Sequence, residues 1–208
     1  METNLETVKR RLKQGQPVAD VHWDAILAPQ YQPHSPQHFT PVEVALRAAQ
    51  LLSNGKPAKI LDVGSGLGKF CLVGALATEA HFTGVERRRA LVSEANRLKE
   101  LLGAERAHFI HGEAMELDWN AFDAFYLFNP FLEHLISQIR LDESVSFSEP
   151  EFEKNFRGVQ AHLRRAPLGT RVALYHGMGG GIPVGYRRLL KENAGTGFLE
   201  LWEKKENV

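Results

Sequence analysis

The sequence predicts an α/β fold, in which a mostly parallel sheet carries helices on both faces. Short apolar segments typical of buried strands alternate with longer segments of helical periodicity along most of the chain. The strand expected at residues 59–63 ends in a turn with glycine at alternate positions, and a helical pattern follows at once. Because glycine has no Cβ, this order of strand, turn and helix lets backbone N–H groups approach a ligand.

The expected elements follow one another from the N-terminus. Residues 1–14 are predicted to form a helix, and the proline-rich residues 15–39 are predicted to be irregular, with Pro36 preventing a helix that would align His34 and His38. A helix with Thr40 as N-cap and Glu43 completing a capping box runs to about Ser53. The remaining elements are strands at 59–63, 81–86, 107–111, 123–128 and 171–176, helices at 68–80, 87–102 and, after Ser148, to about 165, a short helix through Leu135, and a hairpin around 193–196.

Composition limits the classes of function. Lys+Arg and Asp+Glu both number 25, which argues against a large non-specific nucleic-acid surface. Cys71 is the chain's lone cysteine, so no intrachain disulfide can form and a reducing cytoplasm is expected. No apolar run is long enough for a membrane span and no signal region is visible, so we expect no membrane partner.

The glycine turn narrows the choice of ligand. A phosphate-binding loop does not fit, because it would need glycine at Val63 and a hydroxyl residue at Phe70. The dinucleotide pattern G-x-G-x-x-G does not fit either, because its third glycine would fall on Lys69. The pattern D-x-G-x-G-x-G does fit, and it resembles motif I of the class I, seven-stranded S-adenosylmethionine-dependent methyltransferases. The resemblance implies that the turn residues pack against the methionine part of the cofactor and that Asp62 helps to hold its amino group. These turn residues are Gly64, Ser65, Gly66 and Gly68.

Three further segments extend the resemblance. Glu86, at the tip of the second expected strand, is placed to accept ribose hydroxyls, which suits either S-adenosylmethionine or NAD. Glu113 and Ala114 in the segment His-Gly-Glu-Ala resemble motif III, which meets the adenine, and Arg87 completes the predicted cofactor-binding set. Asn129, Pro130 and Phe131 resemble motif IV, which lies beside the transferred methyl group.

The resemblance implies a three-layer sandwich with a seven-stranded sheet, an antiparallel final strand and an N-terminal helical extension. Residues 40–208 would form the S-adenosylmethionine-binding domain, and residues 1–39 would be either a lid over the active site or a structural strap. His176, after the fifth strand, is a candidate general base, although a histidine at such a position more commonly bonds neighbouring backbone. No metal site is expected, because the lone cysteine adds no ligand cluster.

The methyl acceptor is left open. Motif IV of methyltransferases that act on exocyclic or amide nitrogens has two prolines, whereas this chain has only Pro130 before Phe131. The acceptor is therefore an unidentified N or O atom of a small molecule, a protein side chain or a nucleic acid base. Two other classes of function stay open: an NAD-dependent oxidoreductase of Rossmann type, and a catalytically silent cofactor-binding scaffold.

Overall fold

The structure, a computed structural model, describes residues 3–136 and 140–207. The first two residues of the expected N-terminal helix, and residues 137–139 of the expected loop before Ser148, lie outside the described residues. None of the helices in the described part of the chain is long and apolar enough to cross a membrane.

A seven-stranded sheet with the strand order β3-β2-β1-β4-β5-β7-β6 forms the centre of the molecule. β1 to β5 run parallel, and β7 runs antiparallel to both β5 and β6, which confirms the predicted fold. The strands are β1 (Lys59–Val63), β2 (His81–Glu86), β3 (Ala107–His111), β4 (Ala124–Phe128), β5 (Arg171–Tyr175), β6 (Tyr186–Ala194) and β7 (Gly197–Lys204).

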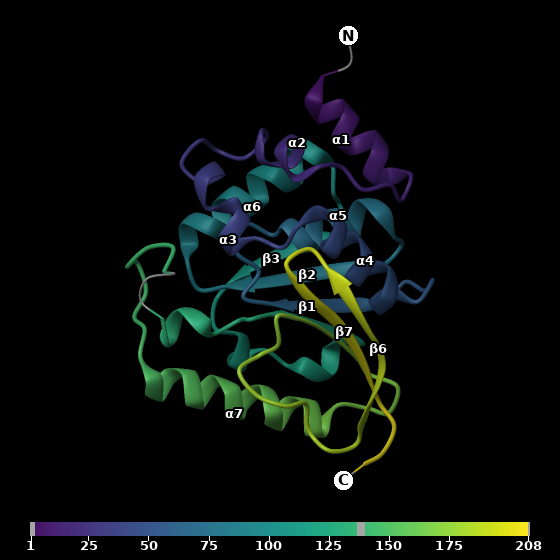
Figure 1. Cartoon of the computed structure of the whole chain (residues 1–208), viewed down its shortest axis with the longest axis vertical. Coiled ribbons are helices and arrows are strands. Elements are labelled where there is room, and N and C mark those ends of the chain that lie inside the picture. Colours follow the sequence, from purple (N-terminus) through teal and green to yellow (C-terminus); the bar gives the residue numbers. More distant parts are fainter. Residues whose placement is uncertain (1–2, 137–139, 208) are drawn as a thin grey trace.

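Helices lie on both faces of this sheet (Figure 1). The α-helices are α1 (Asn4–Lys13), α2 (Asp20–Asp24), α3 (Ser35–His38), α4 (Val42–Ser53), α5 (Lys69–Ala77), α6 (Arg89–Leu102) and α7 (Glu149–Arg165). The 3-10 turns are η1 (Gln32–His34), η2 (Ala114–Glu116), η3 (Trp119–Ala121) and η4 (Leu132–His134). α4, α5 and α6 pack on one face under the N-terminal helices, and α7 packs on the other face together with segments 112–122 and 177–186 (Figure 1).

The N-terminal extension is joined to the larger of the two apolar cores. Val8, Leu12 and Trp23 have no exposed surface and belong to the same cluster as the helices α4 and α5. The buried ammonium of Lys69, at the start of α5, lies 2.5 Å from Asp20 Oδ1 and 3.6 Å from Asp24 Oδ1. Apolar burial and this ion pair together hold residues 8–24 against the sheet domain.

The prediction that residues 15–39 are irregular is wrong in part, because α2, η1 and α3 lie within them. Pro36 occupies the first turn of α3, where the missing N–H of proline costs no helical hydrogen bond. The rings of His34 and His38 consequently meet edge to face, with centroids 5.9 Å apart.

The predicted capping box at Thr40 is also wrong. Pro41 is the N-cap of α4, and no side chain of its own segment caps that helix. The Thr40 hydroxyl instead lies 3.0 Å from the hydroxyl of buried Tyr126, while Asp20 accepts the free N–H of Val42 at 3.0 Å. The extension thus supplies the cap, which no pattern within residues 40–43 could reveal. The capping box predicted at Ser148 is confirmed only in part: its hydroxyl accepts the N–H of Glu151, but its own backbone N–H donates to His134 Nδ1 at 3.2 Å and not to Glu151.

Candidate active site

A cavity of about 420 Å³ opens at the carboxyl ends of the parallel strands. Its walls come from the segments that follow β1, β2, β3, β4 and β5, from residues 36–39 of the extension, and from Pro41. Parallel sheets of this kind bind ligands at this edge, and the volume suits a small organic molecule.

The glycine turn after β1 forms the floor of the cavity. Gly64 and Gly66 line it and have φ values of 77° and 55°, in the left-handed region that favours glycine. A Cβ on Gly66 would lie 3.4 Å from two ring atoms of Phe39, so the extension packs directly on this turn. The turn and Phe39 thus line the same cavity, and Phe39 lies against the turn at Gly66.

Gly68 and Ser65 do not line the cavity. A Cβ on Gly68 would lie 2.3 Å from the Phe109 ring, so this glycine is explained by packing of α5 against the sheet. The Ser65 hydroxyl is buried without a hydrogen-bond partner in the described chain, and the side chain lies close to Gly84.

Asp62 lies beneath the turn rather than in the cavity wall. Only 4% of its surface is exposed, and Cys71 Sγ lies 3.6 Å from its Oδ2. Burial raises the pKa of the Asp62 carboxyl to about 8. The predicted interaction between Asp62 and the cofactor's amino group would therefore have to be made through a water molecule or through the turn.

Glu86, the last residue of β2, lines the cavity where the sequence predicted a ribose-binding acid. Its carboxylate accepts the backbone N–H of Gly66 at 3.1 Å and of Arg88 at 2.9 Å. Burial raises the pKa of Glu86, and these two hydrogen bonds oppose that effect. Each carboxylate oxygen keeps a further lone pair, so the pair of oxygens can accept two vicinal hydroxyls.

Arg87, Glu113 and Ala114 line the next part of the cavity, beside β3. Arg87 Nε lies 2.9 Å from Glu113 Oε1, a charge contact that is not aligned as a hydrogen bond. The Arg87 guanidinium also reaches His134 Nε2 at 3.4 Å. The structure thus brings together the predicted residues that follow β2 and β3.

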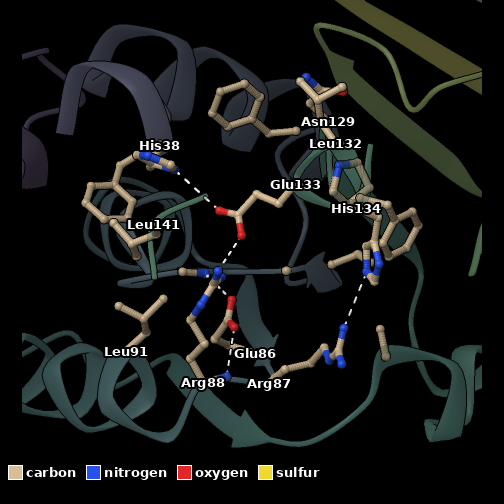
Figure 2. A pocket seen from close by; sticks show the side chains of 18 of the residues that line it. His38, Glu86, Arg87, Arg88, Leu91, Asn129, Leu132, Glu133, His134 and Leu141 are labelled. Atoms are coloured by element: carbon tan, nitrogen blue, oxygen red, sulfur yellow. Dashed lines mark hydrogen bonds and ion pairs between the residues drawn. The ribbon is translucent and has the colours of Figure 1, made fainter. Parts of the chain in front are cut away.

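A network of charged side chains, which the sequence did not predict, crosses the cavity at Glu133 (Figure 2). Glu133 lies between His38 of the extension, 3.5 Å away, and buried Arg88, which it contacts directly. Arg88 also donates from Nε to Asp142 at 3.0 Å. Burial alone would raise the pKa of Glu133, but hydrogen bonds from His38 and Arg88 lower it below the ordinary value. Three segments far apart in sequence are joined here, so no local motif could indicate the network.

Asn129 and His176 occupy equivalent positions, one residue beyond β4 and one beyond β5. Both line the cavity, and both have left-handed backbone, with φ values of 46° and 57°. Such values are uncommon for residues other than glycine, although Asn and His adopt them more readily than most, and strained residues of this kind cluster at active sites. Pro130 and Phe131 also line the cavity, although Phe131 is only 9% exposed and belongs to the core under α7.

Residues 54–154 match the family model described as a methyltransferase domain. A curated tRNA (guanine-N(7)-)-methyltransferase from Synechococcus sp. (strain JA-2-3B'a(2-13)) is 30% identical over 135 residues, which cover 64% of this chain and 47% of the relative. A second relative with this description, from strain JA-3-3Ab, matches equally well. The chain spans about half the length of the curated relatives it matches.

Solved structures share the fold. An RNA methyltransferase from Salinibacter ruber in complex with S-adenosyl-L-homocysteine has a TM-score of 0.56 and 18% identity, covering 80% of this chain and 92% of that one. TrmN from Thermus thermophilus has a TM-score of 0.59 and 17% identity, covering 84% of this chain and 52% of that one. At these identities the likeness establishes the Rossmann-like fold alone.

Proposed function

We propose that this chain transfers a methyl group from S-adenosylmethionine. Its residues 54–154 match the methyltransferase-domain family, and its fold is the Rossmann-like fold of class I methyltransferases. The observation that carries the proposal is the joining of the glycine turn, Glu86 and Asn129 in one cavity at the carboxyl ends of β1, β2 and β4. The methyl acceptor is an N or O atom, as expected from the sequence.

The residues around the cavity fit this cofactor from end to end. Glu86 would accept the ribose hydroxyls, with Arg87, Glu113 and Ala114 around the adenine, and Gly64 and Gly66 against the methionine part. When bound, S-adenosylmethionine supplies an electrophilic methyl group on a positively charged sulfur. The protein then has to hold the acceptor in line and exclude water, and orientation alone can lower a barrier by about 7–11 kcal/mol.

The strand order supports an acceptor position beyond Asn129. β4 and β5 follow β1 on the side away from β2, so the residues at their tips would meet the acceptor if Glu86 holds the ribose of the cofactor. Asn129, Pro130, Phe131 and His176 line the cavity there, and Asn129 would accept a hydrogen bond from the acceptor group. These four are the proposed catalytic residues.

Residues 1–39 are proposed to serve as a strap that also closes the site. Trp23 and Lys69 attach the extension to the core, while Phe39 covers the glycine turn and His38 contacts Glu133. The same segment would thereby hold the domain together and shield the cofactor from water.

The first acceptors to test are nucleic acid bases, because both curated relatives are described as tRNA methyltransferases. The proposed compartment is the cytoplasm, since the single cysteine, Cys71, is buried in the core and cannot form an intrachain disulfide.

The test is transfer of isotope-labelled methyl from S-adenosylmethionine to separate pools of unmodified RNA, protein and small metabolites. Asn129→Ala should bind the cofactor almost as tightly as the wild type but transfer methyl on the order of 10²-fold more slowly, because positioning is lost. Asn120→Ala, an exposed asparagine outside the cavity wall, is the matched control. Normal turnover by Asn129→Ala on an identified acceptor would show that Asn129 has another role.

A nicotinamide-dependent oxidoreductase would also use Glu86, but Lys69 stands where the dinucleotide turn needs its third glycine. Lys69 is buried and paired with Asp20, so its side chain serves the extension rather than a pyrophosphate. A catalytically silent scaffold would only have to bind the cofactor, so it would not account for the strained backbone at Asn129.

A further inference from the structure

The turn of the β6–β7 hairpin reaches across the end of β5 and lies against His176. Thr196, in this turn, lines the cavity beside His176. A Cβ on Gly195 would lie 2.7 Å from the Tyr175 hydroxyl, and a Cβ on Gly197 would lie 2.5 Å from His176 Cε1. The two glycines therefore allow a close approach that any other residue would block.

A short chain of hydrogen bonds links the turn to the end of β5. The backbone N–H of Thr196 donates to the Tyr175 hydroxyl at 3.2 Å, and that hydroxyl lies 3.4 Å from Thr196 Oγ1. Thr196 Oγ1 lies 3.2 Å from His176 Nε2. In the part of the chain that the structure describes, no hydrogen bond is found for His176 Nδ1.

The imidazole of His176 is also held by rings on its other sides. Its ring centroid lies 4.3 Å from that of Tyr175 and 5.7 Å from that of Phe128. An exposed histidine with left-handed backbone is thus held by two rings, a glycine backbone and one hydroxyl. This is more support than a surface histidine needs, and it resembles the way in which catalytic imidazoles are oriented by a third group.

We propose that Thr196 is a positioning residue for the methyl-acceptor end of the cavity. Its Oγ1 accepts the Nε2–H of His176 and so keeps Nδ1 unprotonated and available to the acceptor. Threonine oxygen has two lone pairs, so it can accept this bond and one from Tyr175 together. The inference rests on the proposed function, because it assigns roles within the same cavity.

This arrangement specifies the chemical class of the acceptor. An unprotonated Nδ1 assists an attacking atom that carries a proton, namely an O–H or N–H group. As the new bond from that atom to the methyl carbon forms, the carbon–sulfur bond breaks and its electron pair stays on sulfur. The acceptor's proton passes to Nδ1, and from the exposed ring to water. Guanine N7 is a hydrogen-bond acceptor without a proton, so it would need no such base.

The first experiment needs no acceptor. Two-bond ¹H–¹⁵N spectra of the ¹⁵N-labelled protein, in mildly alkaline buffer, report which ring nitrogen of each histidine carries the proton. The signals of His176 are identified by their absence in His176→Gln. We expect a fixed Nε2–H form in the wild type and in Thr196→Ser, and averaged nitrogen shifts in Thr196→Val and Gly197→Ala. Gly181→Ala, where an added Cβ would meet nothing within 4 Å, is the glycine control.

The second experiment locates the methyl group. An unmodified tRNA transcript is incubated with the enzyme and S-adenosylmethionine, and its nucleosides are analysed by mass spectrometry. Methylation at an amine, a ring N–H or a hydroxyl is expected. Thr196→Val should lower kcat by about tenfold and His176→Asn by about 10²-fold or more, without a change in cofactor affinity. The double variant should be no slower than His176→Asn, because Thr196 acts through that residue.

The outcomes separate this inference from the proposed function. Methyl transfer to guanine N7 would support a methyltransferase while overturning the acceptor class. A protonated Nδ1, or averaged His176 shifts that Thr196→Val leaves unchanged, would overturn the positioning role even if methyl transfer occurs. A protein that binds no S-adenosylmethionine would refute the proposed function whatever the histidine spectra show. If the transcript is not methylated, the ring-nitrogen spectra decide the positioning role.

Discussion

Replacing Glu86 by glutamine tests the proposed ribose contact with the smallest change in shape. In the structure the carboxylate accepts two backbone N–H groups, from Gly66 and Arg88, and each oxygen keeps a lone pair toward the cavity. Glu86→Gln replaces one of these oxygens by an NH₂ group, which can only donate.

The expected loss of affinity follows from the change in hydrogen-bond type. A hydrogen bond to a charged group contributes about 1.5–3 kcal/mol and one between neutral groups about 0.5–1.5 kcal/mol. Each of the two ribose hydroxyls should therefore lose about 1–1.5 kcal/mol, or about 2–3 kcal/mol together. This corresponds to a roughly 30- to 150-fold weaker Kd for S-adenosylmethionine.

Calorimetric titration measures this change directly, and thermal unfolding without ligand reports any separate loss of stability. Glu100→Gln, an exposed acid on α6 outside the cavity, is the matched control and should bind as the wild type does. A folded Glu86→Gln variant with unchanged affinity would show that Glu86 serves the glycine turn and not the ribose.

Two further predictions concern stability. With its pKa raised to about 8, Asp62 keeps its proton in the folded protein up to about pH 8, whereas the unfolded chain loses it near pH 4. As the pH rises between these values, this group therefore lowers the free energy of unfolding by about 1.4 kcal/mol per pH unit. Asp62→Asn should remove that dependence. Between about pH 5 and about pH 7, the free energy of unfolding measured in urea should then fall less in the variant than in the wild type. An equal fall in both proteins would contradict the buried, protonated carboxyl. Trp23→Ala should lower the free energy of unfolding by about 3–5 kcal/mol, because the side chain is fully buried, and a cost below about 1 kcal/mol would contradict the role of the extension as a strap.

The strands were predictable because their signals are local. β1, β2 and β3 begin and end at the expected residues, since each is an apolar run bounded by turn residues. β5 ends one residue before the prediction, at Tyr175, because His176 adopts left-handed backbone, and its ring then contacts Thr196 of the hairpin turn. α5 ends at Ala77 and not at residue 80. At this end of the helix, the Thr78 hydroxyl donates a hydrogen bond to the Gly74 carbonyl.

The residues that close the cavity were not predictable in this way. Glu133, His38 and Arg88 come from three segments, and their contacts exist only after the chain has folded. The same holds for Thr196, which reaches His176 through a hairpin turn. Sequence patterns placed the ends of β1, β2 and β3 correctly, but they do not contain the distances that decide which side chains meet across the sheet edge.

The most direct test of the proposed function is titration of the purified chain with S-adenosylmethionine, S-adenosylhomocysteine and NAD. Glu86 and the Gly64–Gly66 turn line the cavity and can contact an adenosyl ligand. Lys69 stands where a dinucleotide turn needs its third glycine, and its side chain is paired with Asp20. We predict saturable binding of both adenosyl ligands and no binding of NAD. Saturable binding of NAD without binding of S-adenosylmethionine would contradict the assignment of this cavity.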